Sequence, residues 1–255
     1  MKKIKKGIVL AGGNGTRLRP LTNVISKCLL PIYDKPMIYH PIETLKSMGC
    51  EEIMIVTSND HVGQVVQLLG SGKNMGLKFS YEIQDEAGGI AQALSLCEDW
   101  TNKEPVIVIL GDNIYCDNDA LQPFTYHGGA AIYIKEVHDP QRFGVAELDY
   151  DTKMVKGIEE KPKHPKSRYC VTGLYVYDNR VFDIIRTLKP SGRGELEITD
   201  VNNAYIKMGA LKYNFVDCPW LDAGTFDSLL SAANQLLNYR SRKEFDLEKM
   251  KQSNN

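Results

Sequence analysis

Residues 7–17 combine an apolar run with a glycine-rich turn that ends in a fixed cation. Residues 7–11 are apolar and predict a buried parallel strand. The glycines that follow lack a Cβ atom, so the backbone can approach a ligand closely and its N–H groups can form a concavity for anions. Arg17 ends the turn and Lys27 follows soon after, and a guanidinium holds phosphate oxygens in a bidentate fork. The segment therefore predicts a polyphosphate site.

This turn differs from the two common phosphate-binding loops. A P-loop ends in Gly-Lys followed by Ser or Thr, whereas here Gly15 is followed by Thr16 and Arg17. A dinucleotide-binding loop needs glycine or alanine where this chain has Leu18, which weakens the alternative of a nicotinamide-dependent oxidoreductase. A tight turn with a solvated arginine is the plain structural alternative, and the nearby Lys27 argues against it.

The elements around the turn predict a wound, mainly parallel sheet. Strands and helices alternate through the first half of the chain at the spacing of α/β folds. We expect strands at residues 52–57, 77–84 and 105–110, and helices at 36–49, 61–69 and 89–100. Because ligands bind beyond the carboxyl ends of parallel strands, the loops at residues 12–17, 84–89 and 111–113 should meet at one rim.

The second half predicts a small antiparallel platform inserted into that sheet. Short strands are expected at residues 130–137, 144–148, 154–159 and 171–177, then helices at 180–188 and 197–208, a strand at 211–216 and a final helix capped by Thr225.

The expected fold class is α/β, with a Rossmann-like mixed sheet flanked by helices. We expect one domain over residues 1–240, with halves at about 1–125 and 126–225, and a polar tail at 241–255 that frays.

The composition is that of an ordinary globular protein. The chain has 255 residues, 43% of them hydrophobic, and a formal net charge of −1, which disfavours broad binding to nucleic acid. No segment is long enough for a membrane span, and the apolar run after the basic start is too short for a signal peptide. The six cysteines form no Cys-x-x-Cys pair, which disfavours a zinc site or a disulfide framework and indicates the cytoplasm.

Two aspartates are the candidate metal ligands. Asp112 follows a predicted buried strand and Gly111, and Asp222 lies between Trp220 and Gly224 before the final helix. Magnesium takes one or two protein carboxylates and completes its shell with water and phosphate oxygens. A turn aspartate and a helix-terminal carboxylate are the structural alternatives, and the sequence does not show whether the two meet.

A third group of candidates ends a predicted strand. Either Glu159 or Glu160 could accept hydrogen bonds from sugar hydroxyls and Lys161 could pair with a phosphate, while Pro162 blocks continuation of the strand. A solvated charge cluster is the alternative interpretation. The chain has no Gly-x-Ser-x-Gly segment, so its cations, glycines and carboxylates favour phosphoryl or nucleotidyl transfer over nucleophilic catalysis.

These motifs closely resemble the sugar-1-phosphate nucleotidylyltransferase family, and within it the glucose-1-phosphate thymidylyltransferase branch. The matching segments are residues 10–22, 26–31, 33–39, 88–93, 110–113, 142–145, 159–162, 171–175 and 193–200. The resemblance implies Mg²⁺-dependent transfer of dTMP from dTTP to α-D-glucose 1-phosphate. The products would be pyrophosphate and dTDP-glucose, a precursor of dTDP-deoxysugars. It also implies a homo-oligomer, in this family a homotetramer.

The same resemblance implies roles for individual residues. The nucleotide would contact Leu10, Ala11, Gly12, Gly13, Gly15, Thr16, Arg17, Gln84, Gly89 and Asp112. The sugar phosphate would contact Asn113, Gly144, Glu160, Lys161, Val171 and Trp220. The metal ligands would be Asp112 and Asp222, and the catalytic residues Arg17, Lys27, Asp112 and Lys161. The sugar phosphate oxygen would attack in line, with no covalent enzyme intermediate.

Two further alternatives stay open. A nucleotidylyltransferase that prefers UTP or CTP would share the chemistry, and Cys28 and residues 84–87 depart from the pattern of longer relatives near the nucleotide. A non-catalytic regulatory protein that binds nucleotide sugars would keep the fold, yet the cations and aspartates whose loss would favour it are all present. Longer relatives continue into helices that help build a feedback site, so we expect weak or absent feedback inhibition.

Overall fold

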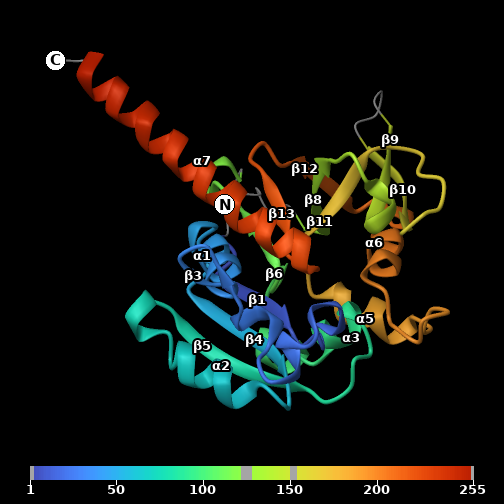
Figure 1. Ribbon diagram of the computed structural model, residues 1–255. Helices are drawn as coiled ribbons and strands as arrows, with labels where there is room; N and C mark the ends of the chain where they lie inside the picture. The colour runs from blue at the N-terminus through green and yellow to red at the C-terminus, as the bar shows by residue number, and fades with distance from the viewer. Residues whose placement is uncertain (1–2, 122–127, 150–153, 254–255) are drawn as a thin grey trace.

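The computed structural model describes residues 3–121, 128–149 and 154–253 and is built around one mixed β-sheet (Figure 1). Nine strands of these ranges form the sheet. In chain order they are β1 (Lys6–Ala11), β4 (Glu52–Ser58), β5 (Lys78–Gln84), β6 (Val106–Leu110), β8 (Ala130–Glu136), β9 (Gly144–Asp149), β10 (Met154–Glu160), β11 (Tyr169–Tyr177) and β12 (Leu211–Phe215).

The parallel half of the sheet positions the glycine-rich turn. β1 lies between β4 and β6 and pairs with both in parallel, and β5 extends the row beyond β4. The carboxyl ends of these strands therefore lie along one edge. Alternate residues of β1 enter opposite cores, since Ile8 packs in one buried cluster and Val9 in the other. Burial on both faces explains why β1 and β6 are almost entirely apolar.

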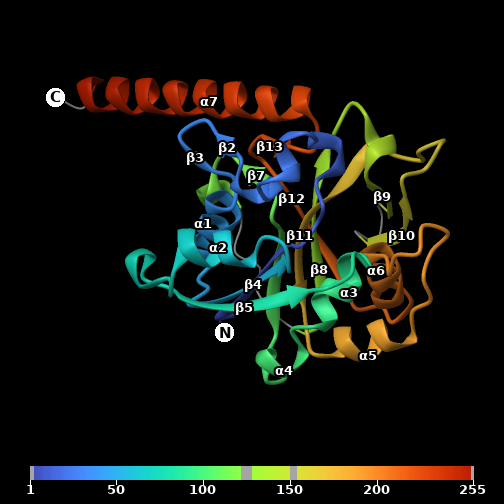
Figure 2. The ribbon, with the colours of Figure 1, turned by 60° about the horizontal axis from the view of Figure 1, so that its bottom comes forward.

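Helices cover both faces of the sheet. The helices α1 (Tyr39–Ser47) and α2 (Val62–Leu69) contribute to one core cluster. The opposite cluster includes residues of α3 (Ile90–Ser95), α5 (Arg180–Thr187) and α6 (Ile198–Lys207). The long helix α7 (Phe226–Ser253) lies along one side of the body, and its C-terminal part extends beyond the body (Figure 2).

The antiparallel part of the sheet begins at β11, which runs antiparallel to β6. β11 also pairs with β8 and β9, and β9 pairs with β10. Two short pairs lie off the sheet, namely β2 (Pro31–Ile32) with β3 (Lys35–Pro36) and β7 (Asn113–Tyr115) with β13 (Trp220–Asp222). The β7–β13 pair was not expected from the sequence, and it joins the loop after β6 to the segment that precedes α7.

The predicted α/β class, with its wound sheet and antiparallel platform, is confirmed. The helix expected at residues 89–100 is instead two short helices, α3 and α4 (Glu98–Thr101). The tail expected to fray at residues 241–255 continues α7 as far as Ser253. The boundary expected between the two halves, near residues 125–126, lies outside the described residues. None of the helices in the described ranges combines the length and the apolar character needed to cross a membrane.

Candidate functional site

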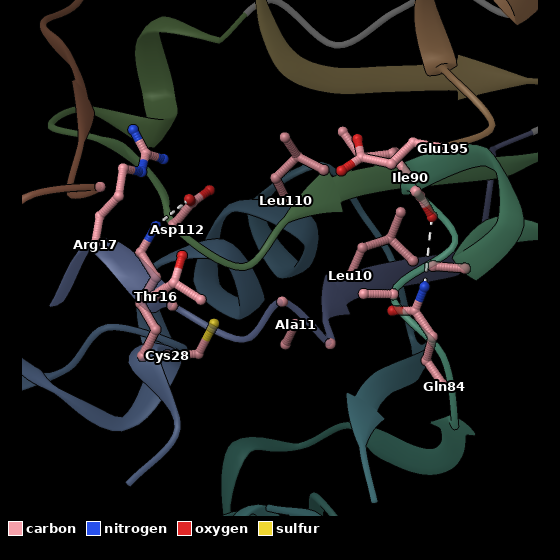
Figure 3. Close-up of a pocket in the computed structure, with 18 residues that line it drawn as sticks. Leu10, Ala11, Thr16, Arg17, Cys28, Gln84, Ile90, Leu110, Asp112 and Glu195 are labelled. Atoms are coloured by element: carbon pink, nitrogen blue, oxygen red, sulfur yellow. Dashed lines mark hydrogen bonds and ion pairs between the residues drawn. The ribbon is translucent and has the colours of Figure 1, made fainter. Parts of the chain in front are cut away.

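A cavity of about 320 Å³ opens at the carboxyl ends of β1 and β6 (Figure 3). Every residue predicted to contact the nucleotide lines it, and so does Lys27. The three loops expected to meet at this rim therefore do meet. The lining also includes residues to which the sequence analysis assigned no role, namely Cys28, Ala87, Ile90, Ala93, Leu110, Glu195 and Gly224.

The glycine-rich turn is held in shape by its own contacts. Gly15 has a φ of +57°, and a Cβ atom there would lie 2.9 Å from Cγ2 of Thr22. The Thr22 hydroxyl donates a hydrogen bond of 2.8 Å to the Gly15 carbonyl oxygen. Leu18 follows in the same turn and is fully buried, which anchors the segment to the core. Arg17 therefore lies between Gly15, which Thr22 holds, and the buried Leu18, and these neighbours on both sides in the sequence keep it at the cavity.

The two ends of the cavity differ in chemistry. Figure 3 shows the charged side chains of Arg17 and Asp112 at one end and the amide of Gln84 at the other. Leu10 and Ile90 line the wall near Gln84. Glu195 also lies at this second end, beside Ile90. An end with fixed cations next to an end with apolar walls, one amide and one carboxylate suits a molecule that carries phosphates on one side and a flat polar ring on the other.

Lys27 and Asp112 form an ion pair at the charged end. Burial alone would raise the pKa of Asp112, but the Lys27 ammonium and a hydrogen bond from Asn113 (2.9 Å) lower that pKa overall. Burial alone would lower the pKa of Lys27. The charge of Asp112 outweighs burial, so the pKa of Lys27 is raised overall. Both groups are therefore charged at neutral pH.

Asp222 lies beside this pair. Burial and the charge of Asp112 raise the pKa of Asp222, so the two carboxylates repel each other across the site. Arg142 donates to Asp222 over 2.6 Å. Arg17 lies close as well, since a Cβ atom on Gly224 would be 3.1 Å from its Nη2 and 3.3 Å from both carboxylate oxygens of Asp222. The structure thus brings together the two aspartates that the sequence could not connect.

The donor set at these aspartates fits a divalent cation. Two carboxylates that repel each other in a partly buried site gain from a cation between them. In the described part of the chain, no group of three or more His, Cys, Asp and Glu side chains could hold a metal. A cation held here would depend on phosphate and water oxygens for its remaining ligands, as is common for hard cations in phosphate sites.

The predicted sugar ligands form a second cluster, next to the cavity. Gly144 and Glu160 are register partners, and the Thr199 hydroxyl donates to Glu160 over 2.7 Å. Val171 is buried in β11, the strand that also pairs with β9. Lys161 Nζ lies 3.4 Å from Glu160. No member of the predicted sugar set lines the 320 Å³ cavity.

Asn113 connects this cluster to the charged end. Its Nδ2 donates to Asp112 and its Oδ1 accepts a bond of 2.5 Å from the Trp220 indole. A Cβ atom on Gly173 would lie 3.0 Å from the same amide, and Gly173 has a φ of +64°. Trp220 also lines a separate cavity of about 230 Å³ together with Arg142 and Asp222. Through Asn113 and Trp220 the predicted sugar ligands border the two aspartates predicted to hold the metal.

Arg193 is a residue that the sequence analysis missed. Its Nη2 lies 3.7 Å from Glu160, and it also pairs with Glu195 and Glu197. The segment 193–200 was used for the resemblance, but the sequence offered no sign that its arginine reaches the glutamate of a distant strand. Arg193 and Lys161 are two cations that border the predicted sugar site.

A family model described as nucleotidyl transferase matches residues 6–239 of the chain. That range contains the glycine turn, both aspartates and all the predicted sugar ligands. The chain belongs to the nucleotidyl transferase family. The family expected from the motifs is therefore confirmed, and the chain is a nucleotidyltransferase.

Named relatives in this family match most of the chain. The glucose-1-phosphate thymidylyltransferase of Mycolicibacterium smegmatis is 46% identical over 234 residues, which cover 90% of this chain and 81% of the relative. The enzyme of that name from Neisseria meningitidis is 43% identical over 235 residues, with the same coverage of both chains.

Solved structures share the fold. A Bacillus anthracis protein assigned as a glucose-1-phosphate thymidylyltransferase, in complex with a sucrose, is 51% identical with a TM-score of 0.85 and covers 91% of this chain and 94% of its own. A UDP-glucose pyrophosphorylase complexed with UDP-glucose is 26% identical with a TM-score of 0.80, and covers 92% of this chain and 99% of its own.

Proposed function

We propose that this nucleotidyltransferase transfers dTMP from dTTP to α-D-glucose 1-phosphate and releases pyrophosphate. The observation that carries the proposal is the meeting of the Arg17 turn and the Lys27–Asp112 pair at the charged end of one cavity, with Asp222 beside the pair. The names of the relatives at 43–46% identity supply the nucleotide and the sugar. The product would be dTDP-glucose, for use in deoxysugar synthesis.

The nucleotide would occupy the 320 Å³ cavity along its length. Backbone N–H groups of the turn at residues 12–16 and the Arg17 guanidinium would hold the triphosphate. The base would lie at the other end, against Leu10 and Ile90, with its polar edge toward Gln84 and Gly89.

Asp112 and Asp222 would hold Mg²⁺. When bound, the ion would neutralise charge on the phosphates and relieve the repulsion between the two carboxylates. Arg142 already contacts Asp222 and Asn113 already donates to Asp112, so both carboxylates are oriented by protein groups.

The transfer itself needs positioning and charge rather than a nucleophile from the protein. An oxygen of the sugar phosphate forms a bond to the α-phosphorus, and the bond from that phosphorus to the bridging β-phosphate oxygen breaks. Lys27 remains protonated because its pKa is raised, and its ammonium neutralises charge that develops at the α-phosphate. Pyrophosphate leaves with the electron pair of the broken bond, held by Arg17 and the glycine turn.

The sugar phosphate would lie on the cluster around Glu160. Glu160 and Asn113 would accept and donate hydrogen bonds to the hexose, with the Gly144 and Val171 backbone beside them and the Trp220 indole nearby. Lys161 and Arg193 would hold the phosphate group. The homotetramer expected from the family resemblance and the cytoplasmic location expected from the cysteines belong to the same proposal.

A preference for UTP is the second candidate, favoured by the similarity to a UDP-glucose pyrophosphorylase. Release of pyrophosphate by the purified protein, with glucose 1-phosphate and Mg²⁺, separates the two. Release that depends on the sugar phosphate and is faster with dTTP supports the proposal. Faster release with UTP keeps the chemistry and changes the base, and no release with any nucleotide contradicts the proposal.

A further inference from the structure

The amide of Gln84 is held in one orientation by its neighbours. Its Nε2 lies 3.4 Å from the carbonyl oxygen of Gly89 and donates a bond of 2.6 Å to Oε1 of Gln92. A backbone carbonyl only accepts hydrogen bonds, so it identifies the end of the Gln84 amide that carries the N–H groups. The nitrogen is thus directed toward Gly89, and Figure 3 shows the oxygen of the labelled Gln84 directed into the cavity.

Two glycines make room for this pair of glutamines. A Cβ atom on Gly12 would lie 2.3 Å from Oε1 of Gln84. A Cβ atom on Gly88 would lie 2.9 Å from Cγ of Gln92. The Gln84 oxygen therefore packs against the glycine turn, and Gln92 reaches Gln84 from α3 by passing over Gly88. Gln84 is only 7% exposed, so its amide has little other space to occupy.

This orientation presents a defined pattern to a pyrimidine. The Gln84 oxygen is an acceptor, and one of the two Nε2 hydrogens is used by Gln92 while the other makes only the long contact of 3.4 Å with Gly89. Because both N–H groups of Gln84 are directed at protein oxygens, its own oxygen is the group left for the base, and this acceptor matches the N3–H of thymine or uracil. Cytosine has an acceptor at the same position, because its N3 carries no hydrogen. A flipped Gln84 amide would match cytosine instead.

We propose that Gln92 is the positioning residue that makes the cavity select thymine or uracil over cytosine. By accepting one hydrogen of the Gln84 amide, Gln92 keeps the acceptor of Gln84 toward the base. The inference rests on the proposed function for the location of the base at Gln84. It adds a selectivity that the identity of Gln84 alone does not supply, because a glutamine amide free to rotate fits either base.

Two substitutions separate the hydrogen bond from the packing. Gln92→Met keeps the length of the side chain and removes the acceptor, whereas Gln92→Glu keeps an acceptor. The ratio of kcat/KM for dTTP to that for dCTP is measured with saturating glucose 1-phosphate and Mg²⁺. We expect the ratio to fall at least about tenfold in Gln92→Met, mainly through KM, and to stay within about threefold in Gln92→Glu. A ratio is used because an added charge changes the binding of both nucleotides alike.

The dissociation constants of dTDP and dCDP, measured by calorimetry without sugar phosphate, test the same selectivity independently of turnover. An unchanged dTDP to dCDP ratio in Gln92→Met, or an equal loss in both variants, would overturn the inference, as would a wild-type preference for cytosine. A wild type that uses UTP and rejects dTTP would contradict the proposed nucleotide. The role of Gln92 would then still be tested by UDP against CDP, since uracil and thymine share the N3–H and C4 carbonyl.

Discussion

Asn113 and Asp222 are register partners in the antiparallel pair of β7 and β13. Because Asn113 directly follows Asp112, this pairing brings Asp112 near Asp222, the other predicted metal ligand. The two segments lie far apart in the sequence. Burial raises the pKa of Asp222, and the nearby charge of Asp112 raises it further. The site is therefore assembled by a strand pair that is separate from the main sheet.

Replacement of Lys27 by methionine should depress turnover far more than nucleotide binding. The ammonium is charged because its pKa is raised, and its greatest value lies in the charge that develops during transfer. We expect kcat to fall about 10²- to 10³-fold, with the KM for dTTP changed less than about threefold. Steady-state kinetics with both substrates varied measures this, and an unchanged kcat would assign the role to another group.

Replacement of Asp222 by asparagine should weaken the response to Mg²⁺. One of the two predicted carboxylate ligands is then lost, so the half-saturating Mg²⁺ concentration should rise at least about tenfold. Asp139→Asn is the matched control, because Asp139 also pairs with Arg142, at 3.0 Å, but is more exposed than Asp222. Titration of Mn²⁺ binding by calorimetry provides a readout that does not depend on turnover. Equal Mn²⁺ affinities for wild type and Asp222→Asn would exclude Asp222 as a ligand.

Two neighbouring glutamates test the proposed sugar site. Glu160 accepts a bond from Thr199 and faces the cluster, whereas Glu159 is exposed. We expect Glu160→Gln to raise the KM for glucose 1-phosphate about tenfold or more while the KM for dTTP stays within about twofold. Glu159→Gln should change neither constant. Equal effects of the two substitutions would indicate a general charge effect and not a contact with the sugar.

His40 should make the protein less stable in mild acid. Burial, with the nearby charges of Lys35 and Arg240, lowers its pKa from 6.5 to about 4, and its Nε2 is buried without a hydrogen-bond partner in the described structure. Because the unfolded state binds this proton at higher pH, stability should fall as the pH drops from 6.5 toward 4, by about 1.4 kcal/mol per pH unit.

His40 forms a hydrogen bond with the Ile32 backbone. The variant His40→Asn keeps a side-chain N–H for such a bond, but the asparagine amide does not titrate. Between pH 7 and pH 5 its Tm should therefore fall by a few degrees less than that of the wild type. The contributions of other groups are common to both proteins and cancel in the comparison. Parallel Tm profiles for the two proteins would show that His40 does not titrate in this range.

The sequence predicted the elements that have long, regular patterns. The apolar runs of β1 and β6 and the helical spacing in α1 were enough to predict the wound sheet and the rim where residues 12–17 and Asp112 meet. These features depend on local burial patterns, which a sequence displays directly.

The contacts that complete the site depend on tertiary structure and were not predicted. β7 and β13 have three residues each, too few for a periodic pattern, and they pair although they lie far apart in the sequence. Gln92 entered the sequence analysis only within the matching segment 88–93, and the role proposed for it depends on its bond to Gln84, which only the structure reveals. The second half of α7 has few apolar residues, yet Lys243 pairs with Asp117 at 2.9 Å, a contact between α7 and the loop after β7 that the sequence does not reveal.

The most direct test of the proposed function is a competition in one reaction. Purified protein is given equal concentrations of dTTP and UTP, limiting glucose 1-phosphate and Mg²⁺, and the nucleotide sugars formed are separated by mass. The ratio of products equals the ratio of the two kcat/KM values and needs no comparison between assays. We predict that dTDP-glucose is the main product, with one pyrophosphate released for each molecule formed. A mixture dominated by UDP-glucose, or pyrophosphate without any nucleotide sugar, would contradict the proposed function.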